Sequence, residues 1–300
     1  MIKARRLGHV TFSTPDLSRQ IDYYVTVLGL DVLHRDQDRA VLATKQGQEA
    51  IVLECDGQPR LLGTSFEMSP GTDLGAVSKV LTEAGIRHER RSEATPGVSQ
   101  SIAFSDPAGT RVELFADYRF ASPGAPDRVI APLKLGHVAN RVTDVHKQVK
   151  FYTELLGFRV SDWRMDVFAF LRCCPDHHTI NFLTHGDNGL HHVAFELKDW
   201  GEIHRACDHV ARNKLSIEWG PARHVIGHNV ACYHRNPDGL LIEMFCELDR
   251  MADEELGYFD PRPWHQDFPQ RPRVWGPEWP RNYWNGEIAP WAQNALKKAG

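Results

Sequence analysis

The chain has 300 residues, of which 42% are hydrophobic and 25% are charged, and its formal net charge at pH 7 is −4. This composition fits a globular protein of one large or two ordinary domains, and the scattered basic residues predict no nucleic-acid partner. No stretch of 18 uncharged apolar residues occurs, so no membrane span is expected. Six cysteines and the lack of a signal peptide predict a cytoplasmic protein with reduced thiols.

The chain opens with a strand and an amphipathic helix that recur further on. Residues 7–32 read LGHVTFSTPDLSRQIDYYVTVLGLDV, and residues 135–160, at an offset of 128, read LGHVANRVTDVHKQVKFYTELLGFRV. In the second copy Gly157 stands where a helix end favours a left-handed residue. The helical spacing there is set by four apolar side chains, Val145, Val149, Tyr152 and Leu156. Each copy therefore predicts strand, helix, turn and strand.

Each half of the chain ends on a similar hairpin. Residues 106–115 read DPAGTRVELF and residues 236–245 read NPDGLLIEMF, with proline and glycine at the turn positions that join two strands. A further strand-helix unit begins at Leu61 and another at Leu190. The sequence therefore predicts four βαβββ modules, at about 5–56, 61–118, 133–186 and 188–248.

Paired modules give an α+β fold, because each short sheet has one face under its helix and one face free. We expect two cup-shaped domains, at 1–120 and 133–248, joined by a proline-containing linker at 121–132. Residues 249–300 should form a C-terminal arm, and five of the eight tryptophans lie in it. Such an arm is expected to dock on the surface and act as a lid.

Alternation along the strands sorts the side chains between the two faces of each sheet. In residues 191–197, the set His191, Val193, Phe195 and Leu197 should pack under the helices, whereas His192, Ala194 and Glu196 should face the cup. In the last strand, Glu243 shares the cup face with apolar neighbours. A buried carboxylate without a partner is costly, and a divalent metal is one partner that would stabilise it.

The predicted metal ligands are His137, His192 and Glu243, which lie on three strands of the C-terminal half. Two imidazoles and a carboxylate form the facial triad of non-haem Fe(II) oxygenases, which leaves positions open for substrate and O2. Most of the 16 histidines should nonetheless be surface or core residues. The positions of His137 and His192 in the repeated modules distinguish these two histidines from the others.

Three further side chains supply acid–base groups. His224 precedes Tyr233 by nine positions, and Tyr233 precedes Glu243 by ten across the second hairpin. His178 comes from the strand before the fourth module. Taken singly, Tyr233 could be a core aromatic and His178 a surface residue.

These motifs resemble the type I extradiol dioxygenases of the vicinal oxygen chelate superfamily, over the whole length of the chain. The motifs are LGHVAN (135–140), DHHTINFL (176–183), GLHHVAFEL (189–197), ARHVIGHNVACY (222–233) and NPDGLLIEMF (236–245). The resemblance implies that His137, His192 and Glu243 bind Fe(II), or alternatively Mn(II). It implies catalytic roles for His178, His224 and Tyr233 in opening a catechol with O2.

The resemblance also implies that only the C-terminal half is catalytic, and that the chain assembles as a homo-oligomer, usually a tetramer. His9 and Glu113 stand at ligand positions in the N-terminal half, but Gly63 stands where the third ligand would be. An alternative is another metalloenzyme of the superfamily, such as a glyoxalase or lyase. A ligand-sequestering protein like the bleomycin-resistance proteins is a second alternative.

The expected substrate contacts are Phe170, Trp219 and Arg281. Residues around WGPARH and PRNYWNGEIAPW (280–291) resemble the homoprotocatechuate branch, in which arginines meet a substrate carboxylate. Arg281 matches one such arginine, or else anchors a loop, but Trp219 stands in place of another. An indole attracts anions less than a guanidinium and adds apolar surface. We therefore expect a neutral or weakly polar substituted catechol.

Overall fold

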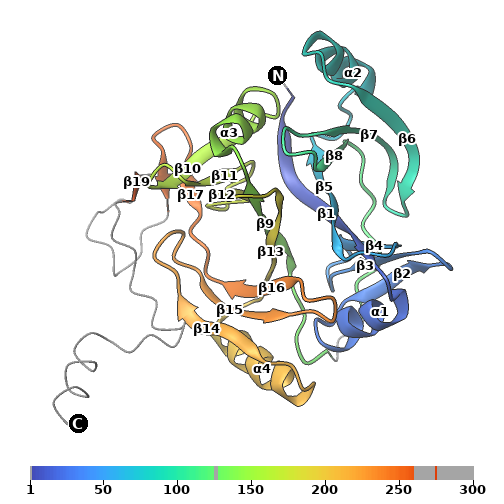
Figure 1. Cartoon of the computed structure of the whole chain (residues 1–300), viewed down its shortest axis with the longest axis vertical. Coiled ribbons are helices and arrows are strands. Elements are labelled where there is room, and N and C mark those ends of the chain that lie inside the picture. The colour runs from blue at the N-terminus through green and yellow to red at the C-terminus, as the bar shows by residue number, and fades with distance from the viewer. Residues whose placement is uncertain (1, 125–127, 260–273, 276–300) are drawn as a thin grey trace.

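The structure is a computed structural model that describes residues 2–124, 128–259 and the short strand at 274–275 (Figure 1). Two curled sheets lie side by side, one from each half of the chain. No helix in these ranges is long and apolar enough to cross a membrane. Arg281 and most of the predicted arm lie outside the described residues.

The N-terminal sheet has eight strands, in the order β2-β3-β4-β1-β5-β8-β7-β6. Its strands are β1 (Ala4–Thr14), β2 (Asp31–Arg35), β3 (Arg39–Ala43), β4 (Glu49–Cys55), β5 (Arg60–Met68), β6 (His88–Thr95), β7 (Val98–Ser105) and β8 (Arg111–Phe115). Its helices are α1 (Leu17–Thr26) and α2 (Leu74–Glu83).

The C-terminal sheet repeats this arrangement, in the order β14-β15-β16-β13-β9-β12-β11-β10, and β19 (Val274–Trp275) extends it beside β10. Its strands are β9 (Lys134–Val142), β10 (Arg159–Arg164), β11 (Phe168–Arg172), β12 (Ile180–Thr184), β13 (Gly189–Glu196), β14 (Ile217–Arg223), β15 (Val230–Arg235) and β16 (Leu241–Cys246). Its helices are α3 (Val145–Glu154) and α4 (Trp200–Arg212), and β17 (Met251–Asp253) pairs with β18 (Tyr258–Phe259).

The element order confirms the prediction of four βαβββ modules paired into two cups. Within each half the two modules join through their first strands, since β1 pairs antiparallel with β5 and β9 with β13. Each helix begins at an aspartate whose side chain accepts a backbone N–H of the first turn. Gly157, after α3, has a φ of +73°, as its position predicted.

The two faces of the C-terminal sheet differ as alternation predicts. Val193 and Phe195 are buried in the main core, which lies under the helices. Tyr233 and Phe245 belong to a smaller cluster on the inner face of the cup. The prediction that His191 packs under the helices is wrong, because the pairing of β13 with β9 shifts register between Leu190 and His192 and leaves His191 exposed.

Candidate metal centre and its surroundings

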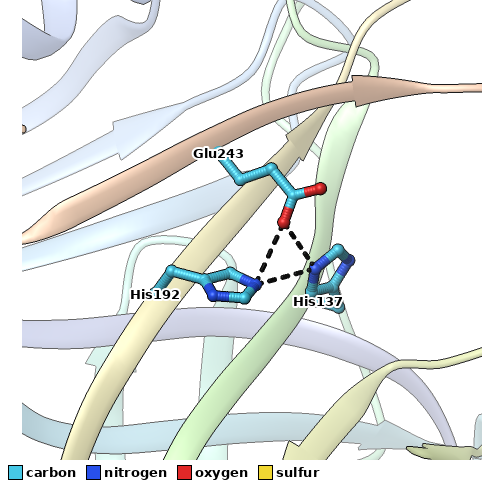
Figure 2. A group of neighbouring side chains, drawn as sticks. All are labelled: His137, His192 and Glu243. Carbon is cyan, nitrogen blue, oxygen red and sulfur yellow. Dashed lines mark hydrogen bonds and ion pairs between the residues drawn. The ribbon is translucent and has the colours of Figure 1, made fainter. Parts of the chain in front are cut away.

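The three predicted ligands meet on the inner face of the C-terminal cup (Figure 2). His137 comes from β9, His192 from the neighbouring β13 and Glu243 from β16, which pairs with β13 on its other side. Glu243 Oε2 lies 3.0 Å from Nε2 of each histidine, and the two Nε2 atoms are 3.2 Å apart. All three side chains are buried.

This spacing fits a single divalent ion. Ligand atoms on one face of an octahedral ion, bound at about 2.1 Å, lie about 3 Å apart. The three donor atoms of His137, His192 and Glu243 form a triangle with edges of 3.0, 3.0 and 3.2 Å. The donor set of two imidazoles and one carboxylate is the facial triad of non-haem iron sites. Among the described residues, this is the one group of three such side chains close enough to share an ion.

Charge at the site favours an ionised carboxylate. Burial alone would raise the pKa of Glu243, but the positive charges of His137 and His192 when protonated, and their hydrogen bonds, outweigh it and hold that pKa well below its usual range. Burial lowers the pKa of His137, so its imidazole is neutral near pH 7. A neutral imidazole and an ionised carboxylate are the forms that bind a metal.

Sequence reasoning missed the residue that orients the carboxylate. Asn229 Nδ2 donates a 2.8 Å hydrogen bond to Glu243 Oε1, the oxygen that does not face His137 and His192. Asn229 is 1% exposed and lies four residues before Tyr233, so alternation along the chain could have assigned it to the same inner face. His192 Nδ1 lies 2.7 Å from His191 Nδ1, whereas His137 Nδ1 has no hydrogen-bond partner within the described ranges.

The three predicted acid–base residues surround this centre. Tyr233 pairs with Glu243 across the β15–β16 hairpin, and its hydroxyl lies 3.0 Å from His224 Nε2. The same His224 nitrogen is 3.9 Å from Glu243 Oε1. The ring of His178 lies against that of His137, with centroids 4.3 Å apart. The second member of each His-His pair therefore faces the centre, as predicted.

Burial sets the protonation state of these groups. It lowers the pKa of His224 to about 4 and that of His178 well below the usual range. Burial and the neighbouring Glu243 raise the pKa of the Tyr233 phenol well above its usual value. Near pH 7 the centre is thus flanked by two neutral imidazoles and one neutral phenol.

Two of the three predicted substrate contacts lie beside the predicted acid–base groups. Trp219 stacks on His224, with centroids 4.6 Å apart and planes within 24°, and its ring lies 5.3 Å from that of Tyr233. Phe170 packs edge-on against His178 at 5.4 Å. The two aromatic side chains therefore neighbour the predicted acid–base groups.

The N-terminal half has the same scaffold without the full ligand set. Gly63 pairs with Thr11, and His192 pairs with Ala139, the residue 128 positions after Thr11, so Gly63 stands at the third ligand position. A Cβ there would lie 3.0 Å from the backbone oxygen of Arg111. Glu113 instead forms an ion pair with Arg91 at 3.3 Å. An arginine therefore supplies the positive charge beside this carboxylate.

Comparison with known proteins matches both halves of the repeat. A model of the Glyoxalase/Bleomycin resistance protein/Dioxygenase superfamily matches residues 6–114 and 134–244. An iron-dependent extradiol dioxygenase from Rhodococcus jostii (strain RHA1) is 26% identical over 274 residues, covering 83% of this chain and 91% of that protein.

Two solved structures share the fold. The Mn(II)-bound glyoxalase from Novosphingobium aromaticivorans has a TM-score of 0.82 at 25% identity, over 93% of this chain and 89% of that one. The homoprotocatechuate 2,3-dioxygenase from Arthrobacter globiformis also has a TM-score of 0.82, at 24% identity, over 96% of this chain and 90% of that one. These matches agree with the resemblance drawn from the motifs.

Proposed function

Because this chain belongs to the Glyoxalase/Bleomycin resistance protein/Dioxygenase superfamily, we propose that it is an extradiol dioxygenase, which opens a catechol ring beside its two hydroxyl groups with O2. The observation that carries the proposal is the triangle of buried donor atoms in the C-terminal cup, together with the acid–base groups around it. The curated relative from Rhodococcus jostii, which matches most of the chain, is itself named an extradiol dioxygenase.

In this proposal His137, His192 and Glu243 hold one divalent metal, Fe(II) by preference and Mn(II) as the alternative. Both metals occur among the similar proteins, in the iron-dependent dioxygenase and the Mn(II)-bound glyoxalase. When bound, the metal would supply positions for the catechol oxygens and for O2. Asn229 keeps the Glu243 carboxylate turned toward the histidines.

The remaining side chains bind the ring and move protons. Tyr233 and His224 hydrogen-bond the catechol oxygens, and their 3.0 Å contact lets the phenol and the imidazole share one proton. His178 acts on the opposite side, beside His137. Phe170 and Trp219 provide apolar ring faces for a neutral substituted catechol. Ring opening at the bond beside the diol gives a hydroxymuconic-semialdehyde-type product, which is yellow.

A second candidate is a glyoxalase-type reaction, because one of the structures with a TM-score of 0.82 is a glyoxalase. Such sites need no set of two histidines and a tyrosine beside the metal. Here His178, His224 and Tyr233 lie around the three predicted ligands. The dioxygenase accounts for this set.

The test is oxygen uptake by the Fe(II)-loaded protein after addition of a small panel of catechols, with the visible spectrum recorded in parallel. We expect one O2 consumed per catechol and a yellow product. Conversion of a hemithioacetal without O2 uptake would instead favour the glyoxalase.

Substitution of the ligands tests the metal site. His137→Ala, His192→Ala and Glu243→Ala should each give a folded protein with little metal and no ring cleavage. His9→Ala and Glu113→Gln change the equivalent positions of the other half, and should retain the metal. Stoichiometric metal in all three ligand variants, measured by elemental analysis, would contradict the assignment.

A further inference from the structure

The two His-His pairs of the C-terminal cup share one geometry. In each pair the Nδ1 atoms of the neighbouring imidazoles lie within hydrogen-bond distance, at 3.0 Å for His177 and His178 and 2.7 Å for His191 and His192. The second histidine faces the metal centre, and the first lies behind it. An Nδ1–Nδ1 hydrogen bond has one proton, so one ring donates and the other accepts.

The first histidines of the two pairs have different surroundings. His191 is exposed to solvent. His177 is fully buried, and its Nε2 lies 2.8 Å from Oδ2 of Asp162, whose side chain is 1% exposed. The two side chains come from segments fifteen residues apart in the sequence, and their pairing follows from the fold.

The surroundings hold His177 in one orientation. Its backbone N–H donates to the carbonyl of Asp249, and the ring of Phe259 packs over its own ring at 4.9 Å. Gly227, at a φ of +77°, lies against the junction of the two rings. A Cβ there would meet Cε1 of His178 at 3.2 Å and Nδ1 of His177 at 3.3 Å. The backbone of Gly227 therefore packs against the junction of the two rings.

With Asp162 ionised and His177 neutral, these two contacts fix the position of each proton. A carboxylate only accepts hydrogen bonds, so the Nε2 atom of His177 must carry the proton that it shares with Asp162. A neutral imidazole has one N–H, which leaves Nδ1 of His177 as an acceptor. The proton in the 3.0 Å contact therefore belongs to Nδ1 of His178. The other nitrogen of His178, Nε2, is left without a proton.

We propose that Asp162 and His177 are positioning residues that hold His178 as its Nδ1–H tautomer, so that its Nε2 enters the reaction as a proton acceptor. This inference rests on the proposed role of His178 in the dioxygenase reaction, and assigns the direction of its first proton transfer. His178 would accept the proton of a catechol hydroxyl at Nε2, share the positive charge with His177 and Asp162 through the Nδ1 hydrogen bond, and later return that proton from Nε2 to the ring-opened product. No other reactant is needed.

Nitrogen NMR of the histidine rings tests the tautomer directly. The sample is the 15N-labelled protein loaded with diamagnetic Zn(II), and a His178→Gln variant identifies the His178 signals. We expect a protonated Nδ1 and an unprotonated Nε2 in the wild-type protein. A proton on Nε2 of His178 in this sample would overturn the proposal, whatever the activity of the enzyme.

Two variants test the consequence for turnover. In Asp162→Asn the side-chain amide can either accept a hydrogen bond from Nε2 of His177 or donate one to it, so one tautomer is no longer selected. His177→Gln removes the imidazole ring. Both should keep the metal and change KM by less than about threefold, and both should lower kcat by roughly 10²-fold as the Nδ1–H tautomer of His178 is depopulated. A merely structural role would not couple the loss of kcat to the change of tautomer.

The matched control is Asp166→Asn, four residues further on. Asp166 also pairs with a histidine, His146 at 3.1 Å, but both side chains are exposed on the surface. This variant should retain wild-type kcat and the wild-type His178 signals. Unchanged kcat and an unchanged tautomer in Asp162→Asn would refute the relay. Because NMR needs no turnover, a wild-type protein that cleaves no catechol would disprove the proposed function without deciding the tautomer.

Discussion

Substitution of Asn229 by alanine should weaken metal binding without removing a ligand. Asn229 donates a 2.8 Å hydrogen bond to Oε1 of Glu243, and both side chains are 1% exposed. A hydrogen bond to a charged group contributes about 1.5–3 kcal/mol. Without this hydrogen bond the Glu243 carboxylate is free to rotate, and its buried Oε1 loses a hydrogen-bond donor. The dissociation constant of the metal should therefore rise by roughly 10- to 100-fold.

The assay is an anaerobic competition between the protein and a coloured chelator for Fe(II), repeated with Mn(II). Asn188→Ala serves as the control, because Asn188 caps Thr143 on the surface at 2.8 Å and makes no contact with the centre. Far-UV circular dichroism establishes that both variants are folded. A dissociation constant within twofold of the wild-type value in Asn229→Ala would refute the argument that this amide orients the carboxylate.

Four further outcomes are expected. His178→Asn, His224→Asn and Tyr233→Phe should retain the metal but lose roughly 10²–10⁴ in rate, and unimpaired turnover in any of them would remove that residue from the mechanism. An alkyl or aryl catechol should have a higher kcat/KM than a carboxymethyl catechol. A tenfold lead of the carboxylated substrate that disappears in Arg281→Ala would instead make this arginine a carboxylate reader. The protein should sediment as a homo-oligomer at micromolar concentration, and a monomer would contradict this. Burial lowers the pKa of His9 to about 4, so the unfolded chain takes up a proton below pH 6.5 that the folded chain does not. Between pH 7 and 5 this lowers the free energy of unfolding by about 2 kcal/mol, and urea titrations of His9→Gln should show a correspondingly smaller fall.

The sequence alone determined the modular fold and the main side chains of the centre, because both follow from periodicity. A 128-residue repeat with matching turns predicts repeated modules whatever their packing. A strand has a period of two, so His192 and Glu243 could be assigned to the same face of the sheet before any contact was known. The turn residues of the second hairpin then placed Tyr233 opposite Glu243, as the strand register shows.

Tertiary structure decided the partners of these side chains, because contacts across a sheet or between loops leave no local pattern. The shifted register beside His192 exposed His191, against the alternation rule. In the N-terminal half, Gly63 leaves one ligand position without a side chain. There Arg91, on β6, forms an ion pair with Glu113, on β8. The contact between Asp162 and His177 joins β10 to the loop before β12. Only the folded chain brings these charges and protons together, and they set the chemistry of the centre.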